Sequence, residues 1–594
     1  MSKKKIMNYS IPLLVLILFA ISFTAVTQAP AVIDRQNQPT NRTATTPCSA
    51  TLSSDQKLQI PYVLVSGLPY SVSFGLSADA GGQILIKLVS YTQNTTPYSC
   101  PPGSFDSKNM VLYVPDIVYN AVSYWAIFKY QPTSDGQIWF KLSAASPNGP
   151  GSQVLARVEV PGYLQDLNLP VYADLEDGAG TYYALVVAPQ ALLELTGVTF
   201  KVIDQFTPGT NYMLGQEDTP GARQQAAKIT KVLYDDGRNI MVRYNSGLAD
   251  TLGDLGFEMD ILNQTPMVLF STGTEDAVKD VRSDKNPTVD QLIGKITEAD
   301  VKTFISNLSG ESTVTVNGAV TTIDGRQTES TNLKLASQYV LDQLKAMNLT
   351  ASFDDWTATD ENGAVLKDRN VIGEITGKTK PGEIIILVAH LDSLPSKGRA
   401  PGADDDASGC AALLAGAKAM SSYSFQRTIR FVFSTGEEDG IFGSKDYANK
   451  AKAANQNITA VINLDMISYN FAKTAPSKQN VKTRNSKNTL YNNDLNLAQV
   501  YLNVVKDYGL TGTITPVHVP DNDRFSDQSS FWDKGYAAIW IIEDDSAGGP
   551  PPQQPWNPYY HSTDDKLANM DMTYCTAMVK AAAGTAATLA VPSP

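Results

Sequence analysis

The sequence is short of positive charge, with 47 lysines and arginines against 60 aspartates and glutamates and a formal net charge of −13. This balance argues against a nucleic-acid partner, because nucleic-acid phosphates would be repelled. After residue 29 there is no apolar run long enough to span a bilayer. Histidine is also scarce, with three in 594 residues. Because histidine is so rare, finding two of the three histidines in similar sequence contexts is unlikely to be accidental.

The first 29 residues have the layout of a secretory signal peptide. Lys3, Lys4 and Lys5 precede an apolar run from Ile11 to Val26, and small residues follow the run. We expect a protein that is secreted or enters the endolysosomal lumen through the secretory pathway. The alternative is a signal-anchored membrane protein, because the apolar run approaches the length that spans a bilayer. A membrane contact is expected only in that case.

Sequons for N-glycosylation agree with the secretory route. They lie at Asn41, Asn94, Asn263, Asn307, Asn348 and Asn457. Cys48 and Cys100 lie in one N-terminal region and could pair, although connectivity cannot be deduced from sequence. Cys410 and Cys575 lie in apolar helical contexts, and we expect them to be buried thiols.

At this length about two to four domains are expected. Residues 30–46 are rich in Pro, Gln and Thr and indicate an exposed linker. Residues 47–207 show short alternating runs between turn residues, which predict a β-rich, sandwich-like domain. Residues 208–286 predict a small α/β segment, with strands at 239–243 and 257–262 on either side of a short helix. This segment is either a pro-region that covers an enzyme or an ordinary spacer.

Residues 287–592 have a different pattern. Leu333 to Met347 has apolar residues at helical spacing. Short and almost continuous apolar runs follow at Ile384–Val388, Ile429–Phe433, Val461–Leu464 and Ala538–Ile542. Such runs are typical of strands that are covered on both faces. We predict an α/β catalytic domain with a largely parallel mixed sheet and helices on both faces.

Polar side chains follow these strands where each strand ends. His390 follows the first run, Glu437 and Glu438 follow the second, and Asp465 ends the third. Asp405 and His561 lie in loops that could reach the same edge, where open α/β sheets bind their ligands. Two imidazoles and three carboxylates can hold two zinc ions if one carboxylate bridges them.

Five motifs in this order resemble the co-catalytic zinc aminopeptidases. They are His390-Leu-Asp-Ser, Gly402-Ala-Asp-Asp-Asp, Gly436-Glu-Glu-Asp-Gly, Asn463-Leu-Asp-Met and Tyr559-Tyr-His-Ser-Thr-Asp. The resemblance covers roughly 287–592 and is to the secreted bacterial leucyl aminopeptidase type, with glutamate carboxypeptidase II, glutaminyl cyclases and transferrin receptors as related proteins. It implies a zinc-peptidase fold.

The resemblance also implies two zinc ions per chain. One would be held by His390 and Asp465 and the other by Glu438 and His561, with Asp405 as the bridging ligand. In the family, the peptide bond that follows the bridging aspartate is often cis.

The same resemblance implies the catalytic roles and the substrate. Glu437 would be the general base that acts on a metal-bridging hydroxide, and Asp392 would orient the His390 imidazole. The implied activity is the release of N-terminal amino acids from peptides or proteins with a free N-terminus. The alternatives are a single-zinc glutaminyl cyclase, a carboxypeptidase of the same family and a non-catalytic receptor-like ectodomain. The Asn463-Leu-Asp-Met motif favours the peptidase, and the retention of all five ligands argues against the receptor.

Overall fold

The structure is a computed structural model. It describes residues 49–594 apart from residues 54, 66–67, 80–81, 95–102, 120–121, 134–136, 148–152, 168, 208, 270–284, 360–363, 547–555 and 594. The expected signal peptide and linker, Asn41, Cys48 and Cys100 lie outside the described residues. No helix in the described part of the chain is both long and apolar enough to span a bilayer.

The chain divides into two compact units. The first is Met1–Val171 with Leu185–Pro208, and the second is Tyr172–Ala184 with Gly209–Pro594. The boundary between the units falls within strands β10 (Val171–Glu176) and β11 (Tyr182–Ala188). The second unit holds the three segments Tyr172–Ala184, 209–286 and 287–592, so its N-terminal limit differs from the expected boundary at residue 207.

The first unit is built around one eight-stranded sheet with the order β1-β2-β3-β4-β8-β7-β6-β5. Its strands are β1 (Ala50–Leu52), β2 (Lys57–Val65), β3 (Leu68–Ala78), β4 (Ile84–Gln93), β5 (Gly103–Asp106), β6 (Val111–Tyr119), β7 (Val122–Gln131) and β8 (Trp139–Pro147). The ends of the sheet pair back, β1 with β6 and β2 with β5. The sheet closes on itself, so the expected sandwich-like arrangement is wrong. Alternating runs show only that each strand has one buried face, and a sandwich and a closed sheet share that property.

The rest of the first unit is small. Strand β9 (Gln153–Glu159) pairs antiparallel with β12 (Phe200–Phe206). The 3-10 turn η1 (Leu164–Leu167) and helix α2 (Gln190–Thr196) lie between them in sequence.

Residues 209–286 begin with a small sheet of order β14-β15-β13-β16. Its elements are β13 (Tyr212–Glu217), α3 (Ala222–Ile229), β14 (Tyr234–Asp235), β15 (Asn239–Arg243), α4 (Ser246–Gly253) and β16 (Phe257–Ile261). The strands and helix expected in this segment are confirmed. Met259 and Ile261 share a hydrophobic core with Trp356 and Phe442 of the larger domain, and the Ile261 N–H donates to the Gly440 carbonyl at 3.2 Å. The small sheet is therefore packed into the second unit.

The main sheet has eight strands in the order β19-β20-β22-β21-β23-β26-β24-β25. They are β19 (Thr350–Thr359), β20 (Val365–Ile375), β21 (Lys380–His390), β22 (Arg427–Ser434), β23 (Asn457–Leu464), β24 (Ser477–Lys482), β25 (Ile514–Val519) and β26 (Ala538–Glu543). The central strands β22, β21, β23 and β26 run parallel, β20 pairs antiparallel with β22, and β24 pairs antiparallel with β26 but parallel with β25. The expected mixed, largely parallel sheet is confirmed, and the four apolar runs are its four central strands.

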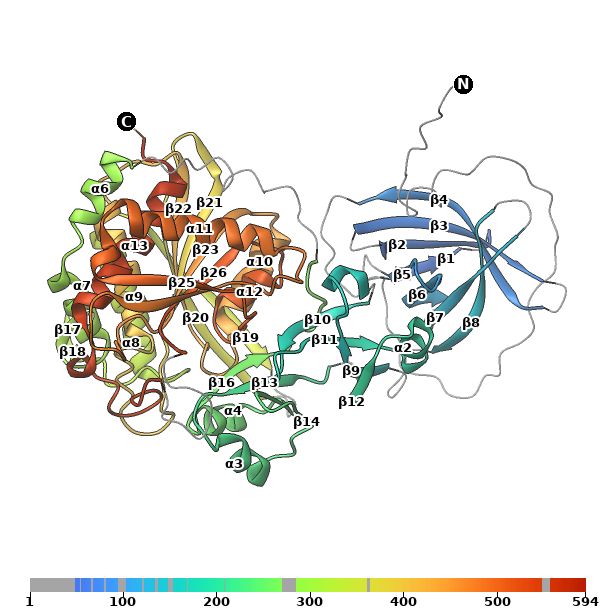
Figure 1. The fold of residues 1–594 in the computed structure, drawn as a ribbon, viewed down its shortest axis with the longest axis horizontal. Coiled ribbons are helices and arrows are strands. Elements are labelled where there is room, and N and C mark those ends of the chain that lie inside the picture. The colour runs from blue at the N-terminus through green and yellow to red at the C-terminus, as the bar shows by residue number, and fades with distance from the viewer. Residues whose placement is uncertain are drawn as a thin grey trace, which may run out of the picture. The chain divides into compact units, whose positions relative to one another are not determined.

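Helices cover both faces of this sheet (Figure 1). They are α6 (Pro287–Gly294), α7 (Glu298–Leu308), α8 (Thr331–Ala346), α9 (Ala407–Met420), α10 (Phe442–Ala453), α11 (Tyr491–Asp507), α12 (Gln528–Trp532) and α13 (Met572–Ala590). Shorter elements are the hairpin β17 (Thr313–Val316) and β18 (Ala319–Thr322), and the turns η2 (Leu510–Gly512) and η3 (Leu567–Asn569).

Successive side chains of β21 point to opposite faces of the main sheet, so the strand contributes to two hydrophobic cores, one on each face. Ile385 and Leu387 are buried in one core with α9 and α13. Ile386 and Val388 are buried in another with Tyr447 of α10 and residues of α12. A strand buried on both faces needs apolar residues at every position, which is the pattern that its sequence shows.

Candidate metal centre

The predicted ligands meet at the carboxyl ends of three neighbouring parallel strands. His390 is the last residue of β21, Asp465 directly follows β23, and Glu438 lies in the turn after β22. Because β21 pairs in parallel with both β22 and β23, these ends lie at one edge of the sheet. The topology alone therefore brings together three side chains of types that bind metal ions.

Asp405 lies between the two imidazoles. Its Oδ1 is 3.1 Å from His390 Nε2, and its Oδ2 is 3.3 Å from His561 Nε2. Asp465 Oδ1 is 3.4 Å from His390 Nε2, and Glu438 Oε2 is 3.0 Å from His561 Nε2. The structure thus brings all five predicted ligands together in two groups that share Asp405.

Asp406 also reaches this cluster. Ligand atoms of His390, Asp406 and Asp465 lie within 4.8 Å of one another, as do those of His390, Asp405 and Glu438. The Asp406 carboxylate, however, already accepts hydrogen bonds from the backbone N–H groups of His390 (3.2 Å) and Gly409 (2.8 Å), and it caps α9. These backbone bonds favour Asp405 over Asp406 as the ligand. The bond between the two aspartates is cis, as the resemblance implies.

Arg326 holds the loops that follow β21. It is fully buried, and its guanidinium donates to the carbonyl oxygens of Leu391 (2.6 Å), Pro401 (2.7 Å), Gly402 (2.9 Å) and Leu308 (2.8 Å). Burial lowers the pKa of Arg326, but a guanidinium remains charged. These bonds fix the loop that carries Asp405 relative to the end of the strand.

Asp392 connects two of the ligand loops. Its Oδ2 accepts from the Glu438 backbone N–H at 3.1 Å, and its Oδ1 is 3.8 Å from His390 Nδ1. The first contact is a hydrogen bond and the second is longer than one. The role of Asp392 in orienting the imidazole remains a prediction.

The other imidazole is oriented from an unexpected direction. His561 Nδ1 lies 2.8 Å from the carbonyl oxygen of Gly253, the last residue of α4 in the small α/β segment. If Nδ1 carries the proton, this bond leaves Nε2 as the free ligand atom that faces Asp405 and Glu438. Backbone carbonyls have no sequence signature, so this contact could not be predicted.

Two further supporting groups were not expected. Asp565 accepts from the backbone N–H groups of Asp404 (2.9 Å) and Asp405 (3.1 Å). Ser526 donates to Asp465 Oδ2 at 2.5 Å. Asp565 stands one residue beyond the His561 motif quoted above, and Ser526 lies in a Ser-Asp pair whose function the sequence does not reveal.

Electrostatics favour a bound cation at this site. Burial raises the pKa of Glu438 to about 7, and the neighbouring Asp405 adds to the rise. Burial also raises the pKa of Glu437 well above its usual range, and the nearby His390 charge only partly opposes this. The neighbouring carboxylates, Asp465 at His390 and Glu438 at His561, raise the pKa of both imidazoles well above their usual value although burial acts in the opposite direction. The protein alone needs protons to balance these carboxylates, and a metal ion can supply that charge instead.

The donor set also fits zinc. Imidazole nitrogen and carboxylate oxygen are usual zinc ligands. Three buried atoms at the site have no hydrogen-bond partner among the described residues: Glu438 Oε1, His390 Nδ1 and Asp392 Oδ1. Unpaired buried polar atoms are costly, and Glu438 Oε1 in particular would gain a partner in a bound ion.

The remaining candidates are the cysteines and the glycosylation sites. Cys410 and Cys575 are free and buried, as expected. Asn263 is 9% exposed and its amide donates to Asp533, an environment that disfavours glycan attachment, and this candidate stays an untested prediction. Asn348 is exposed, and Asn94, Asn307 and Asn457 are partly buried; all four remain predictions.

Comparison with known proteins supports the assignment. Residues 370–586 match the model of peptidase family M28. A probable leucine aminopeptidase of Arthroderma benhamiae is 27% identical over 294 residues, which cover 48% of this chain and 72% of the relative. A probable zinc metalloprotease of Pyrenophora tritici-repentis is 28% identical over 197 residues, which cover 29% of this chain and 45% of the relative.

Among solved structures, the LapA aminopeptidase of Legionella pneumophila aligns with 65% of this chain and 99% of its own, at 19% identity and a TM-score of 0.48. The segment that matches the family model contains all five residues of the cluster. The resemblance to zinc aminopeptidases is confirmed by the family model and the curated relatives, and residues 370–586 of this chain are similar to peptidase family M28.

Proposed function

We propose that this protein is a dizinc aminopeptidase that removes N-terminal residues from peptides. The observation that carries the proposal is the position of Asp405, with one carboxylate oxygen beside each imidazole. In this arrangement His390 and Asp465 would hold one zinc ion, Glu438 and His561 would hold the second, and Asp405 would be shared. When bound, two such ions activate water and polarise the scissile carbonyl.

Glu437 is the residue of this chain that moves the proton. It is 8% exposed and follows Gly436 at the same sheet edge as the ligands, next to Glu438. A carboxylate that binds no metal keeps its lone pairs free, so Glu437 can take a proton from the attacking water and return it to the leaving amine.

The relatives support a requirement for a free N-terminus. Curated relatives from Arthroderma benhamiae and Arthroderma otae are described as probable leucine aminopeptidases. We extend that activity to this chain, with peptides or proteins that have a free N-terminus as substrates. We also propose that the protein travels through the secretory pathway, and N-terminal sequencing of the purified protein would show whether the segment up to Ala29 is removed.

Zinc quantification and a substrate panel test the function. We expect two zinc ions per chain, and hydrolysis of aminoacyl p-nitroanilides but not of their N-acetylated forms. One zinc ion with cyclisation of an N-terminal glutamine would indicate a glutaminyl cyclase, and release of C-terminal residues would indicate a carboxypeptidase. Hydrolysis that persists after the zinc has been removed by a chelator would refute the metal mechanism.

A further inference from the structure

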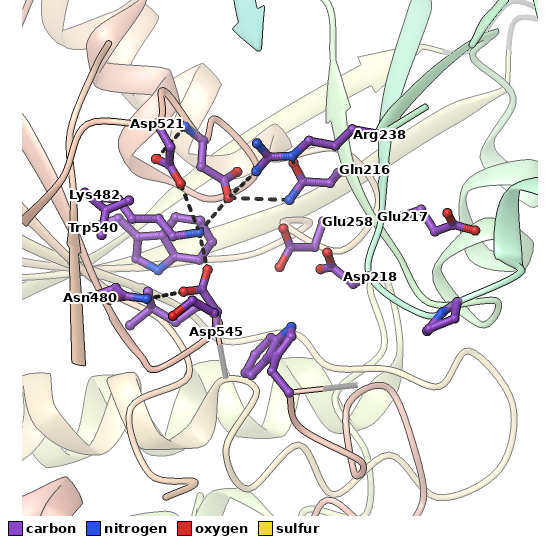
Figure 2. A pocket seen from close by; sticks show the side chains of 16 residues that line it. Gln216, Glu217, Asp218, Arg238, Glu258, Asn480, Lys482, Asp521, Trp540 and Asp545 are labelled. Atoms are coloured by element: carbon purple, nitrogen blue, oxygen red, sulfur yellow. Dashed lines mark hydrogen bonds and ion pairs between the residues drawn. The ribbon is translucent and has the colours of Figure 1, made fainter. Parts of the chain in front are cut away.

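A cavity of about 300 Å³ is lined by residues of the small sheet and of the main sheet (Figure 2). The small sheet contributes Asp218 and Glu258 to its lining, and β24 and β26 contribute Lys482 and Trp540. The Trp540 indole N–H donates to the Asp465 carbonyl at 3.3 Å. One wall of the cavity therefore touches the backbone of a predicted zinc ligand.

A second wall leads to the other half of the centre. Trp556 lines the cavity and lies against Tyr560, with ring centroids 6.0 Å apart. Tyr560 in turn stacks on the imidazole of His561, with centroids 3.7 Å apart. A substrate whose scissile bond lies at the metal centre could therefore place an adjacent side chain in this cavity.

The cations of the cavity are already paired. The Lys482 ammonium is 2.6 Å from Asp523 and also contacts Asp545. The Arg238 guanidinium lies 3.4 Å from Asp523 and donates to Gln216 at 2.8 Å. These contacts are drawn in Figure 2. Both positive charges are therefore paired with acidic groups on one side of the cavity.

Asp218 and Glu258 take no part in these ion pairs, and the charges of Lys482 and Arg238 offset the rise in the pKa of Asp218 only in part. They face each other inside the cavity (Figure 2), and neither forms an ion pair among the described residues. Glu258 Oε2 is buried and has no hydrogen-bond partner in the described part of the chain. Burial and the charge of Asp523 raise the pKa of Asp218 to about 7, and burial and the charge of Asp218 raise that of Glu258. Two such carboxyls cannot both ionise cheaply unless a cation lies between them.

We propose that Asp218 and Glu258 bind the cationic side chain of a lysine or arginine at the N-terminus of the substrate. This inference rests on the proposed aminopeptidase function and adds its substrate class. The lining suits a long side chain with a charged end, because Trp556 and Ile542 supply apolar surface for the methylene stem. A bare divalent metal ion would instead require oxygen ligands around it and would leave most of this volume and its indole wall unused.

The test compares substrates that differ in the terminal charge of one side chain. The norleucyl p-nitroanilide is the reference, because its side chain is apolar and uncharged. We expect the zinc-loaded protein to hydrolyse lysyl and arginyl p-nitroanilides with a kcat/KM at least about tenfold above that for this reference. In Asp218→Asn/Glu258→Gln, kcat/KM for the lysyl substrate should fall by about 10–100-fold, the range expected for lost hydrogen bonds to a charged group. The norleucyl value should stay within about threefold.

Two controls isolate the cavity. Asp235→Asn removes a carboxylate from the same small sheet but outside the cavity lining, and it should leave the lysyl-to-norleucyl ratio unchanged. Glu258→Gln alone keeps the shape of the side chain, and it should lower the ratio even if the double variant folds poorly. Zinc content and circular dichroism establish that each variant is intact.

A binding measurement separates this inference from the proposed function. L-lysine and L-norleucine are titrated into the zinc-loaded protein, and we expect L-lysine to bind more tightly. In the double variant this difference in affinity should disappear. If no aminoacyl substrate is cleaved but this preference is present, the peptidase function fails and the cavity assignment stands. The assignment is overturned if the unmodified protein shows equal kcat/KM and equal affinity for the lysyl and norleucyl compounds. It is also overturned if the variants keep the preference for lysine.

Discussion

Asp260 attaches the small sheet to the main domain, and its replacement by asparagine should loosen that attachment. Asp260 lies in β16 and is fully buried. Its Oδ1 is 2.6 Å from the Lys445 ammonium of α10, and its Oδ2 accepts from the Arg524 guanidinium. Asp260→Asn removes the charge that both cations share while keeping the size of the side chain.

The size of the loss in stability depends on which carboxylate partners the two cations retain in Asp260→Asn. Removing one partner of a buried ion pair costs about 3–5 kcal/mol, because the other charge stays buried and uncompensated. Arg524 retains Asp533 at 3.0 Å, but the Lys445 ammonium retains it only at 4.0 Å. We therefore expect the lower end of the range, a loss of about 3 kcal/mol in the free energy of unfolding, with Lys445 as its main source.

The loss should depend on pH in a defined direction. Burial alone would raise the pKa of Asp260, but the charges of Arg524 and Lys445 lower it below its usual value. A carboxyl whose pKa is lowered by folding stabilises the folded state above its unfolded pKa, which is about 3.9 for aspartate. The difference between the unmodified protein and Asp260→Asn should therefore be complete at pH 7 and shrink as the pH falls through the folded pKa.

Amide hydrogen exchange within β16 measures this loss locally, and urea unfolding measures it globally. Asp300→Asn is the matched control, because Asp300 pairs with Lys418 at 2.8 Å on the surface and should cost at most about 1 kcal/mol. Asp260→Asn combined with Lys445→Met should recover much of the stability, since no lone ammonium is then buried. If Asp260→Asn costs no more than the Asp300 control, the ion cluster does not hold the small sheet.

Three changes at the metal centre have separate expected outcomes. Glu437→Gln should keep its zinc, measured by mass spectrometry, while kcat falls by about 10²–10⁴-fold; an unchanged kcat would show that another group moves the proton. Asp405→Ala should lose both ions on dialysis, because both imidazole groups share this carboxylate. Ser526→Ala removes the hydrogen bond to Asp465, and competition with a chelating dye should show zinc affinity about 10–100-fold weaker. Retained zinc in Asp405→Ala, or unaltered affinity in Ser526→Ala, would contradict these roles.

The strands that carry the centre could be predicted because they are buried on both faces. Apolar runs such as Ile384–Val388 are typical of such strands, and three of the four runs are followed by a predicted metal ligand. Strand β24 was not predicted, because it buries polar residues: Gln479 bonds to the Tyr501 hydroxyl, and Lys482 pairs with Asp523. Those partners are distant in sequence, so a local pattern does not reveal them.

The supporting contacts were missed for a related reason. Gly253 acts through a carbonyl oxygen that every residue has, and Glu258 looks like any solvated acid in a strand. Each acquires a function only because the small sheet packs against the catalytic domain. The sequence shows ligand types and their order, whereas the groups that orient them and shape the cavity depend on tertiary packing.

The small α/β segment is therefore part of the enzyme, and we infer that it is retained in the active form. Strand β16 alternates between two roles: Phe257, Met259 and Ile261 face the shared hydrophobic core, and Glu258 and Asp260 lie on the other face. Glu258 lines the cavity while Asp260 anchors the strand to Lys445 and Arg524. Removing the segment as a pro-region would expose that core and take away the carboxylate that Lys445 and Arg524 share. It would also take away the carbonyl that orients His561. A fully active protein that begins after residue 286 would refute this inference, because zinc binding at His561 and stability should both be lost in such a fragment.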